Sequence, residues 1–169
     1  MKKLQILVPQ YKETEDIIKP LLDSIEVQQN IDLSKDIGVI IVNDGTDVHL
    51  SEAFFKRYSF PIEYHLNKHK GVSATRNACL DYATAEYVMF CDADDMFYNA
   101  CGMYIIFREI ESGGFDSLVS AFIEESRDHN TKEPLYINHD MDTTFVHGKV
   151  HRRQYLIDNN IRWNDNLTI

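Results

Sequence analysis

Short apolar runs alternate along this chain with longer segments in which apolar residues recur at helical spacing. The runs at residues 4–8 and 37–42 predict buried strands, because each is continuous and is followed at once by turn-forming or helix-breaking residues. Further strands are predicted at residues 62–66, 87–91 and 117–123, and helices at residues 15–29, 51–58, 72–82 and 99–111. Strands and helices therefore alternate from the N-terminus, which indicates an α/β fold of βαβ units around a mainly parallel sheet flanked by helices.

The pattern weakens after Glu124. Residues 126–142 are polar and rich in turn formers, so they predict a loop rather than a strand or a helix. Residues 143–146 predict one more strand, and residues 152–159 predict a helix. No repeat or linker divides the chain, and its 169 residues suit one domain with a real core.

The charge balance narrows the possible partners. Lys and Arg number 17 against 27 Asp and Glu, which gives a formal net charge of -10. Nonspecific binding to nucleic acid or to an anionic membrane is therefore not expected, and a phosphate-bearing ligand would need a cation or local basic residues. No apolar run approaches the length of a membrane span, and residues 4–8 are too short for the core of a signal peptide. The three cysteines form no CxxC pair, which favours a reduced, cytoplasmic setting.

An acidic cluster directly follows the predicted strand at residues 87–91. Asp92, Asp94 and Asp95 place three carboxylates within four positions. Like charges that lie this close together are tolerated when they are solvated or when a cation neutralises them, and carboxylate oxygens suit Mg²⁺ or Mn²⁺. The alternative is an acidic turn that leads into a helix, since Asp is a good turn and N-cap residue. This cluster alone leaves both interpretations open.

Other polar segments also follow predicted strands. Residues 9–13 follow the first strand, and residues 43–46 follow the second. The carboxyl ends of parallel strands lie at one edge of a sheet, so these segments and the acidic cluster can converge on one ligand. Gly71 opens the helix predicted at 72–82 and allows close backbone approach, and Arg76 could reach a phosphate or a base edge. The alternative for Arg76 alone is a solvated side chain on a capped helix.

Together these motifs resemble a family 2 inverting glycosyltransferase with the GT-A fold. The resemblance runs from Leu4 to about Ile161 and rests on four segments in order, which are Val8-Pro9-Gln10-Tyr11, Asn43-Asp44-Gly45-Thr46, Gly71-Val72-Ser73-Ala74-Thr75-Arg76-Asn77 and Asp92-Ala93-Asp94-Asp95. It implies transfer of a sugar from a nucleotide-diphosphate donor, with a UDP-sugar favoured, to a hydroxyl of a saccharide, lipid-linked or protein acceptor, as in cell-surface polysaccharide biosynthesis. It also implies one GT-A domain over residues 1–169, with a nucleotide-sugar-binding core at 1–124 and the start of an acceptor-side region at 125–169.

The resemblance assigns the donor nucleotide to residues of the first three segments. Pro9 and Tyr11 match the loop that packs on the base and ribose, and Glu13 lies near the ribose. Asp44 matches the aspartate that accepts a hydrogen bond from the base. Gly71 allows the loop to close, and Arg76 matches the arginine near the base and the diphosphate.

The last segment matches the DxD motif of the family. By this resemblance Asp92 and Ala93 contact the donor, and Asp94 binds a divalent metal, Mn²⁺ or Mg²⁺, together with Asp92. Asp95 supports the site from beside it. The metal would bridge the diphosphate and neutralise the charge that develops on the leaving group.

The catalytic base is not matched. The family uses a carboxylate, usually in a Glu-Asp pair, and this chain reaches Ile169 about where that pair would begin. We therefore expect an N-terminal part of a longer protein, which binds nucleotide and metal but transfers sugar poorly by itself. His147 and His151 could share a helix face as metal ligands, although an acceptor-binding or structural role is favoured for them, and His147 could approach the donor diphosphate. Trp163 could stack on a sugar or belong to the core.

Three alternatives compete with the transferase. A nucleotidyltransferase usually carries a glycine-rich basic loop after its first strand, whereas residues 9–13 contain no glycine. A dinucleotide-binding dehydrogenase is disfavoured because G-x-G-x-x-G is absent from the sequence. A catalytically inactive nucleotide-binding or assembly module of the same fold stays open.

Overall fold

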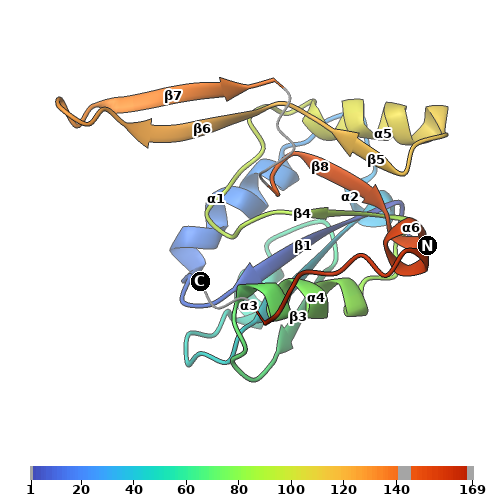
Figure 1. Ribbon diagram of the computed structural model, residues 1–169, viewed down its shortest axis with the longest axis horizontal. Coiled ribbons are helices and arrows are strands. Elements are labelled where there is room, and N and C mark those ends of the chain that lie inside the picture. The colour runs from blue at the N-terminus through green and yellow to red at the C-terminus, as the bar shows by residue number, and fades with distance from the viewer. Residues whose placement is uncertain (1, 141–145, 167–169) are drawn as a thin grey trace.

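The buried apolar runs form the middle of a single large sheet. The computed structural model describes residues 2–140 and 146–166, and its main sheet has the strand order β3-β2-β1-β4-β8-β5 (Figure 1). Four of these strands are parallel to one another, namely β1 (Leu4–Gln10), β2 (Ile37–Asn43), β3 (Ile62–Leu66) and β4 (Tyr87–Phe90). Strand β8 (Lys149–Arg152) runs antiparallel to β4 and to β5 (Ser117–Val119). The prediction of a mainly parallel sheet is confirmed.

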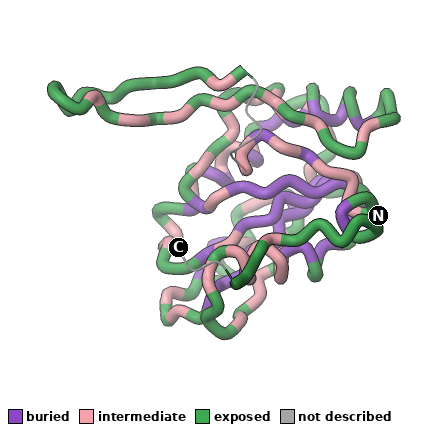
Figure 2. Tube along the Cα trace, viewed as in Figure 1, coloured by how far each residue is buried: buried purple, intermediate pink, exposed green. Residues whose placement is uncertain are grey.

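Helices cover both faces of this sheet. One face packs against α1 (Glu15–Glu26), α3 (Glu52–Phe55) and α5 (Gly102–Ser112), and the other packs against α4 (Val72–Tyr82) and α6 (Arg153–Asp158). A further short helix, α2 (Leu33–Asp36), leads directly into β2. The central strands are buried along nearly their whole length (Figure 2). Strands enclosed on both faces need apolar residues at successive positions, which explains why their sequences are continuous apolar runs.

One buried polar residue interrupts the apolar run of β1. Gln5 is 2% exposed and lies on the α4 side of the sheet, where its Oε1 accepts hydrogen bonds from the backbone N–H groups of Thr84 and Ala85, both at 2.7 Å. These two residues connect α4 to β4. The Gln5 side chain therefore satisfies two backbone donors outside the strands and helices, of which that of Ala85 is buried, and it holds the entry to β4 in place.

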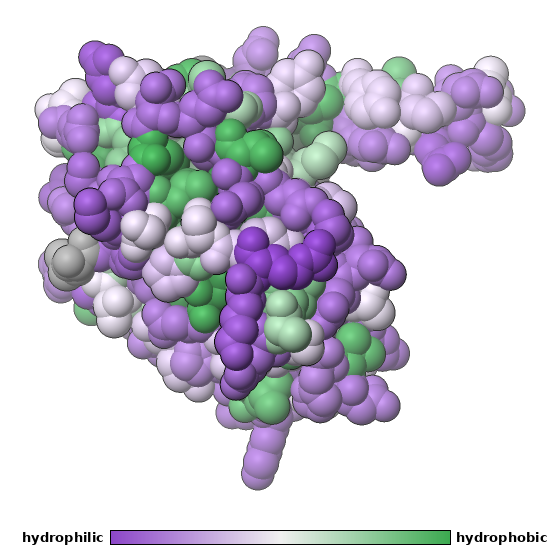
Figure 3. All heavy atoms as spheres, turned by 180° about the vertical axis from the view of Figure 1, so that it is seen from behind, coloured by the Kyte–Doolittle hydropathy of each residue, from purple (hydrophilic) through white to green (hydrophobic). Residues whose placement is uncertain are grey.

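The segment that we predicted as a loop is a β-hairpin, so that prediction is wrong. Strands β6 (Phe122–Arg127) and β7 (Pro134–His139) pair antiparallel in a separate two-stranded sheet, and the prediction of one strand over 117–123 is corrected to two strands in different sheets. The hairpin projects from the body as an arm with a largely hydrophilic surface (Figure 1 and Figure 3). Neither of its faces joins the main core, so its sequence lacks the apolar alternation that marks a half-buried strand.

The predictions for the C-terminal part of the chain are confirmed in part. The helix predicted at 152–159 is confirmed as α6, whereas strand β8 was not predicted. The strand predicted at 143–146 lies mostly outside the described residues.

The cysteines are free, with Cys79 and Cys91 buried and Cys101 exposed. None of the helices that the structure describes combines the length and the apolar character that a membrane crossing requires.

The strand order creates one special position at the edge of the sheet. From β1 the chain proceeds outward to β2 and β3, and then returns to place β4 on the opposite side of β1. The carboxyl ends of β1 and β4 therefore flank the point at which the order of the strands reverses. In open α/β sheets the loops diverge at such a point and leave a crevice in which ligands bind.

We expect Gln5→Leu to lower the free energy of unfolding by about 1–3 kcal/mol, because it leaves the buried N–H of Ala85 and the N–H of Thr84 without their acceptor. Chemical denaturation of the purified chain measures this change. Gln29→Leu is the matched control, since Gln29 is exposed and the same replacement should change stability by about 0.5 kcal/mol or less. Equal stability of the two variants would show that the Gln5 hydrogen bonds contribute nothing.

Candidate functional site

A cavity of about 340 Å³ lies at the strand-order reversal. It is lined by nearly all of the residues that the sequence assigned to a donor site, namely Pro9, Tyr11, Glu13, Asp44, Gly71, Arg76, Asp92, Ala93 and Asp94. These residues come from the ends of β1, β2 and β4 and from the start of α4. A larger hollow of about 740 Å³ between α2 and α5 contains none of them, so size alone does not identify the site.

Asp44 is the most enclosed carboxylate of the cavity. It is 4% exposed, and its two oxygens accept hydrogen bonds from the backbone N–H groups of Lys70 at 2.8 Å and Gly71 at 2.9 Å. The Nδ1 atom of His69 lies 2.9 Å from the same carboxylate. These contacts join the end of β2 to the loop that opens α4, so Asp44 shapes the cavity wall.

Gly45 permits this close approach. Its φ is +72°, and a Cβ atom at this position would lie only 2.2 Å from the backbone nitrogen of His69. The loop that carries His69 could not reach Asp44 if residue 45 had a side chain.

An aromatic pair forms another part of the wall. The rings of Tyr11 and His69 lie 5.1 Å apart with their planes inclined by 30°. Tyr11 is 41% exposed, and its backbone N–H donates to the carboxylate of Glu13 at 2.6 Å. A flat, partly exposed ring above a polar floor is a surface on which a planar heterocycle can stack.

Arg76 is held by two partners on the opposite side of the cavity. Its Nη2 donates to Oδ1 of Asp92 at 2.7 Å, and its guanidinium lies 4.8 Å from the ring centre of Trp163. The solvated alternative is therefore wrong, since only 14% of the side chain is exposed. Its buried Nε has no hydrogen-bond partner among the residues that the structure describes, which leaves one donor of the guanidinium unused.

The sequence left two roles open for Trp163, stacking on a sugar or packing in the core, and the structure shows that it packs against the core. Its ring packs edge-on against Phe90 at 5.7 Å, and its backbone exchanges two hydrogen bonds of 2.9 Å with the side chain of Asn77. The indole thus holds Arg76 against the sheet.

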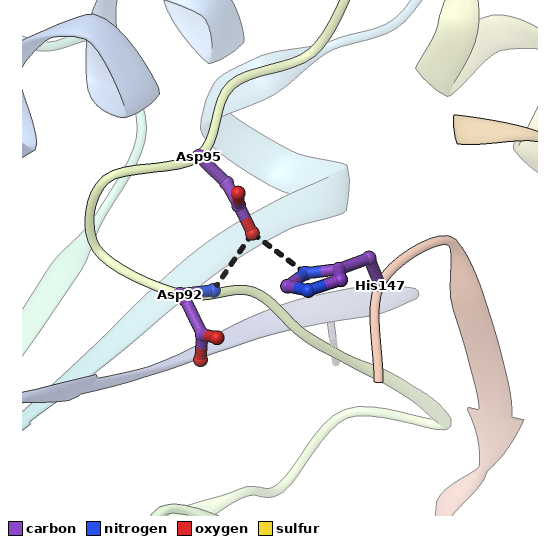
Figure 4. Close-up of side chains that lie close together, drawn as sticks. All are labelled: Asp92, Asp95 and His147. Atoms are coloured by element: carbon purple, nitrogen blue, oxygen red, sulfur yellow. Dashed lines mark hydrogen bonds and ion pairs between the residues drawn. The ribbon is translucent and has the colours of Figure 1, made fainter. Parts of the chain in front are cut away.

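The turn after β4 collects the acidic residues (Figure 4). The backbone N–H of Asp95 donates to the carbonyl of Asp92 at 3.2 Å, and Oδ2 of Asp95 lies 3.3 Å from the backbone nitrogen of Asp92. Nδ1 of His147, from the segment before β8, lies 2.7 Å from Oδ2 of Asp95. Burial raises the pKa of the Asp95 carboxyl, an effect that His147 opposes and that the charges of Asp92 and Asp94 reinforce.

This turn offers a donor set that fits a divalent cation. Ligand atoms of Asp92, Asp95 and His147 all lie within 4.8 Å of one another. Asp94 does not belong to this group, but it is exposed and lines the cavity. Carboxylate oxygens with one imidazole nitrogen are a ligand combination that Mn²⁺ and neighbouring divalent metals accept.

The sequence did not predict the pairing of His147 with Asp95 or the contact of His69 with Asp44. The proposed helix face shared by His147 and His151 does not exist, because His151 lies in strand β8 and its Nδ1 contacts Oγ of Ser117 at 2.8 Å. The sequence marks His147 as a possible ligand, but its partner Asp95 follows only from the pairing of β8 with β4.

Comparison with known proteins matches nearly the whole chain to one protein family. The family described as Glycosyl transferase family 2 matches residues 5–166. Among curated relatives, "Glycosyltransferase GlyA" of Streptococcus pneumoniae is 34% identical over 95 residues, which are 55% of this chain and 13% of that protein. "Cholesterol galactosyltransferase" of Borreliella burgdorferi is 25% identical over 123 residues, which are 71% of this chain and 32% of that protein.

Solved structures share the fold. S. aureus TarS 1–349 in complex with UDP superposes with a TM-score of 0.72 at 20% identity, covering 98% of this chain and 51% of that one. Mannosyltransferase PcManGT from Pyrobaculum calidifontis, solved with GDP-Man and Mn²⁺, superposes with a TM-score of 0.68 at 16% identity and covers 98% of this chain and 48% of that one. The chain thus spans about half the length of these structures and less of the curated relatives, and the expected GT-A fold is confirmed.

We expect Gly45→Ala to destabilise the chain more than Gly113→Ala. The two glycines have nearly equal φ angles of +72° and +73°, but a Cβ at Gly113 meets nothing within 4 Å. Gly113→Ala should therefore cost only the backbone strain of this conformation, in which ψ is 169°, about 1–3 kcal/mol. Gly45→Ala should cost about 1–3 kcal/mol more than Gly113→Ala, because the steric clash is added. Urea unfolding of both variants measures the difference, and equal losses would contradict the close approach of His69.

Proposed function

Because the chain belongs to glycosyl transferase family 2, we propose that its cavity binds a nucleotide-diphosphate sugar, with a UDP-sugar as the preferred donor, for transfer to an acceptor hydroxyl. The observation that carries this proposal is the convergence of four sequence segments on one cavity at the strand-order reversal. Each segment alone has an ordinary structural explanation. Their convergence provides a stacking surface, a buried carboxylate, a guanidinium and an acidic turn within the reach of one ligand.

The base and ribose would occupy the part of the cavity near β1 and β2. The exposed ring of Tyr11 offers the base a stacking partner, and Pro9 and Glu13 line the same wall. Asp44 is proposed to accept a hydrogen bond from the base. Three donors of residues 69–71 already contact its carboxylate, and a carboxylate has about four acceptor positions, so one position remains for a donor on the base.

The diphosphate would lie between the start of α4 and the acidic turn. Gly71 and Arg76 line the cavity here, and the first backbone N–H groups of a helix attract anions. The guanidinium of Arg76 is fixed in place by Asp92 and Trp163, so little entropy would be lost when it contacts a phosphate. These local positive groups would compensate for the net charge of -10 of the chain.

A divalent metal is proposed to bind at the same turn. Asp92 and Asp94 would hold it, Ala93 between them lines the donor cavity, and Asp95 supports the turn from beside it. When bound, Mn²⁺ or Mg²⁺ would neutralise the charge that develops on the nucleoside diphosphate as it leaves. Among the fold neighbours, PcManGT was solved with GDP-Man and Mn²⁺ and TarS with UDP or UDP-GlcNAc, which supports a nucleotide-sugar donor.

The reaction is proposed to invert the anomeric carbon. The acceptor hydroxyl, on a saccharide, a lipid-linked chain or a protein, would attack from the face opposite the diphosphate while a carboxylate takes its proton. We assign that carboxylate to no residue of this chain. The residues described above would bind and orient the donor and stabilise the leaving group.

We expect UDP to bind the purified chain more tightly in the presence of Mn²⁺ than in its absence, because the metal offsets the repulsion between the diphosphate and the acidic turn. Isothermal titration calorimetry with UDP, with and without Mn²⁺, measures this dependence. GDP serves as the control for base selection and should bind more weakly. Failure of both nucleotides to bind in either condition would refute the donor-site proposal.

We expect Asp94→Asn to lower Mn²⁺-dependent UDP affinity at least about tenfold, since an amide is a poorer ligand than a carboxylate for a hard cation. Binding of UDP without metal should change little. Asp47→Asn is the control, because Asp47 is an exposed carboxylate that does not line the cavity. Unchanged affinity of Asp94→Asn in Mn²⁺ would remove Asp94 from the metal site.

A further inference from the structure

The geometry points to His147 as a nitrogen ligand of the proposed metal, joined by Asp95 as a full ligand rather than a support. This inference rests on the proposed function, because it concerns the metal that would accompany the donor. It adds a ligand from the segment before β8 to the carboxylates of the turn after β4. A nitrogen ligand also makes the site selective, favouring Mn²⁺ over Mg²⁺ and Ca²⁺.

The distances between the candidate ligand atoms suit one ion. Two neighbouring ligands of a six-coordinate ion with bonds near 2.1 Å lie about 3 Å apart, and two opposite ligands about 4 Å apart. Nδ1 of His147 and Oδ2 of Asp95 are separated by 2.7 Å, and the ligand atoms of the whole group lie within 4.8 Å. His147 and Asp95 can therefore bind as neighbours almost without moving.

Asp92 needs a larger adjustment than its two neighbours. Its carboxylate points toward Arg76, to which Oδ1 is bound at 2.7 Å, rather than toward the His147–Asp95 pair (Figure 4). A rotation of the side chain would turn an oxygen to the ion. Asp92 would then join the metal to the arginine that contacts the donor.

Strand pairing explains how His147 reaches this turn. Strand β8 runs antiparallel to β4, with Val150 opposite Met89, so the start of β8 lies beside the end of β4. His147 immediately precedes Gly148 and strand β8, and Asp92 follows soon after β4. The same register that completes the sheet therefore brings the imidazole to the acidic turn.

Contacts of the His147 ring and of the backbone beside it fix His147 in this position. The carbonyl of Gly148 accepts hydrogen bonds from the backbone N–H and the Oγ of Ser120 at 2.7 and 2.9 Å, and a Cβ at Gly148 would lie 2.7 Å from the Ser120 carbonyl oxygen. The ring of His147 lies 5.6 Å from that of Phe122, which stacks on His139 at 4.5 Å. The imidazole is thus held between the hairpin base and the acidic turn before any metal binds, as a preformed ligand should be.

The chemistry requires one proton movement. Nδ1 must present its lone pair to the metal, so the imidazole proton must be carried by Nε2 in the bound state. If the metal-free imidazole carries protons on both nitrogens, the proton between Nδ1 and Asp95 is released to solvent. If it carries only that proton, Nδ1 loses it and Nε2 gains one from solvent. The alternative is that His147 only forms an ion pair with Asp95 and never touches a metal.

Pulsed electron paramagnetic resonance of the Mn²⁺-loaded chain with UDP tests the assignment directly. A coordinated imidazole couples its nitrogen nucleus to the electron spin of Mn²⁺. We expect this coupling in the unaltered chain and in His129→Gln, which removes an exposed histidine at the hairpin tip. We expect it to vanish in His147→Gln, together with at least about a tenfold loss of Mn²⁺ affinity.

Metal competition gives a second readout. The ratio of Mn²⁺ to Mg²⁺ affinity should fall in His147→Gln, because the loss of a nitrogen ligand affects Mn²⁺ more than Mg²⁺. Mn²⁺ and UDP binding without nitrogen coupling, or with equal coupling in His147→Gln, would overturn the assignment of His147 and leave the donor site intact. If neither UDP nor Mn²⁺ binds to the unaltered chain, the proposed function fails and this inference fails with it.

Discussion

The common direction of β1, β2 and β4 is the constraint on which the rest of the site depends. Because these strands are parallel, they all end at one edge of the sheet, and the position of β4 on the far side of β1 opens that edge at one point. Polar segments that are far apart in the sequence meet there because the strands that they follow end together. The helices on both faces bury the apolar side chains of the strands, and this burial holds the edge rigid.

The acidic groups at this edge are not left to repel one another. Asp44 accepts hydrogen bonds from backbone N–H groups and contacts His69, Asp92 forms an ion pair with Arg76, and Asp95 contacts His147. Each partner comes from a different segment, so charge compensation also fixes the relative positions of those segments. A partly buried carboxylate without a partner would be unfavourable, so each of these carboxylates favours the arrangement in which its partner segment lies beside it.

The central strands and the residues that line the cavity could be predicted from the sequence because both depend on local patterns. The runs at 4–8 and 37–42 must be apolar throughout to be buried on two faces, and turn residues at their ends mark the edge of the sheet. The hairpin at 122–139 could not be predicted in this way, since its strands are stabilised by pairing with each other rather than by a buried face. The contacts of His147 and Trp163 depend on chain segments that meet only in the folded protein. A single sequence contains no local signal for such meetings.

The placement of β8 also bears on how the chain is made. All residues that line the cavity at the strand-order reversal precede residue 95, and the four parallel strands are complete by Phe90. The free side of β4 is nevertheless covered by residues 149–152, which leave the ribosome much later. Until then β4 is an apolar edge strand with unpaired backbone groups, the type of edge at which nascent chains associate with one another. The segment that brings an imidazole to the acidic turn is therefore also the segment that pairs this side of β4, and it does so only after most of the chain has been made.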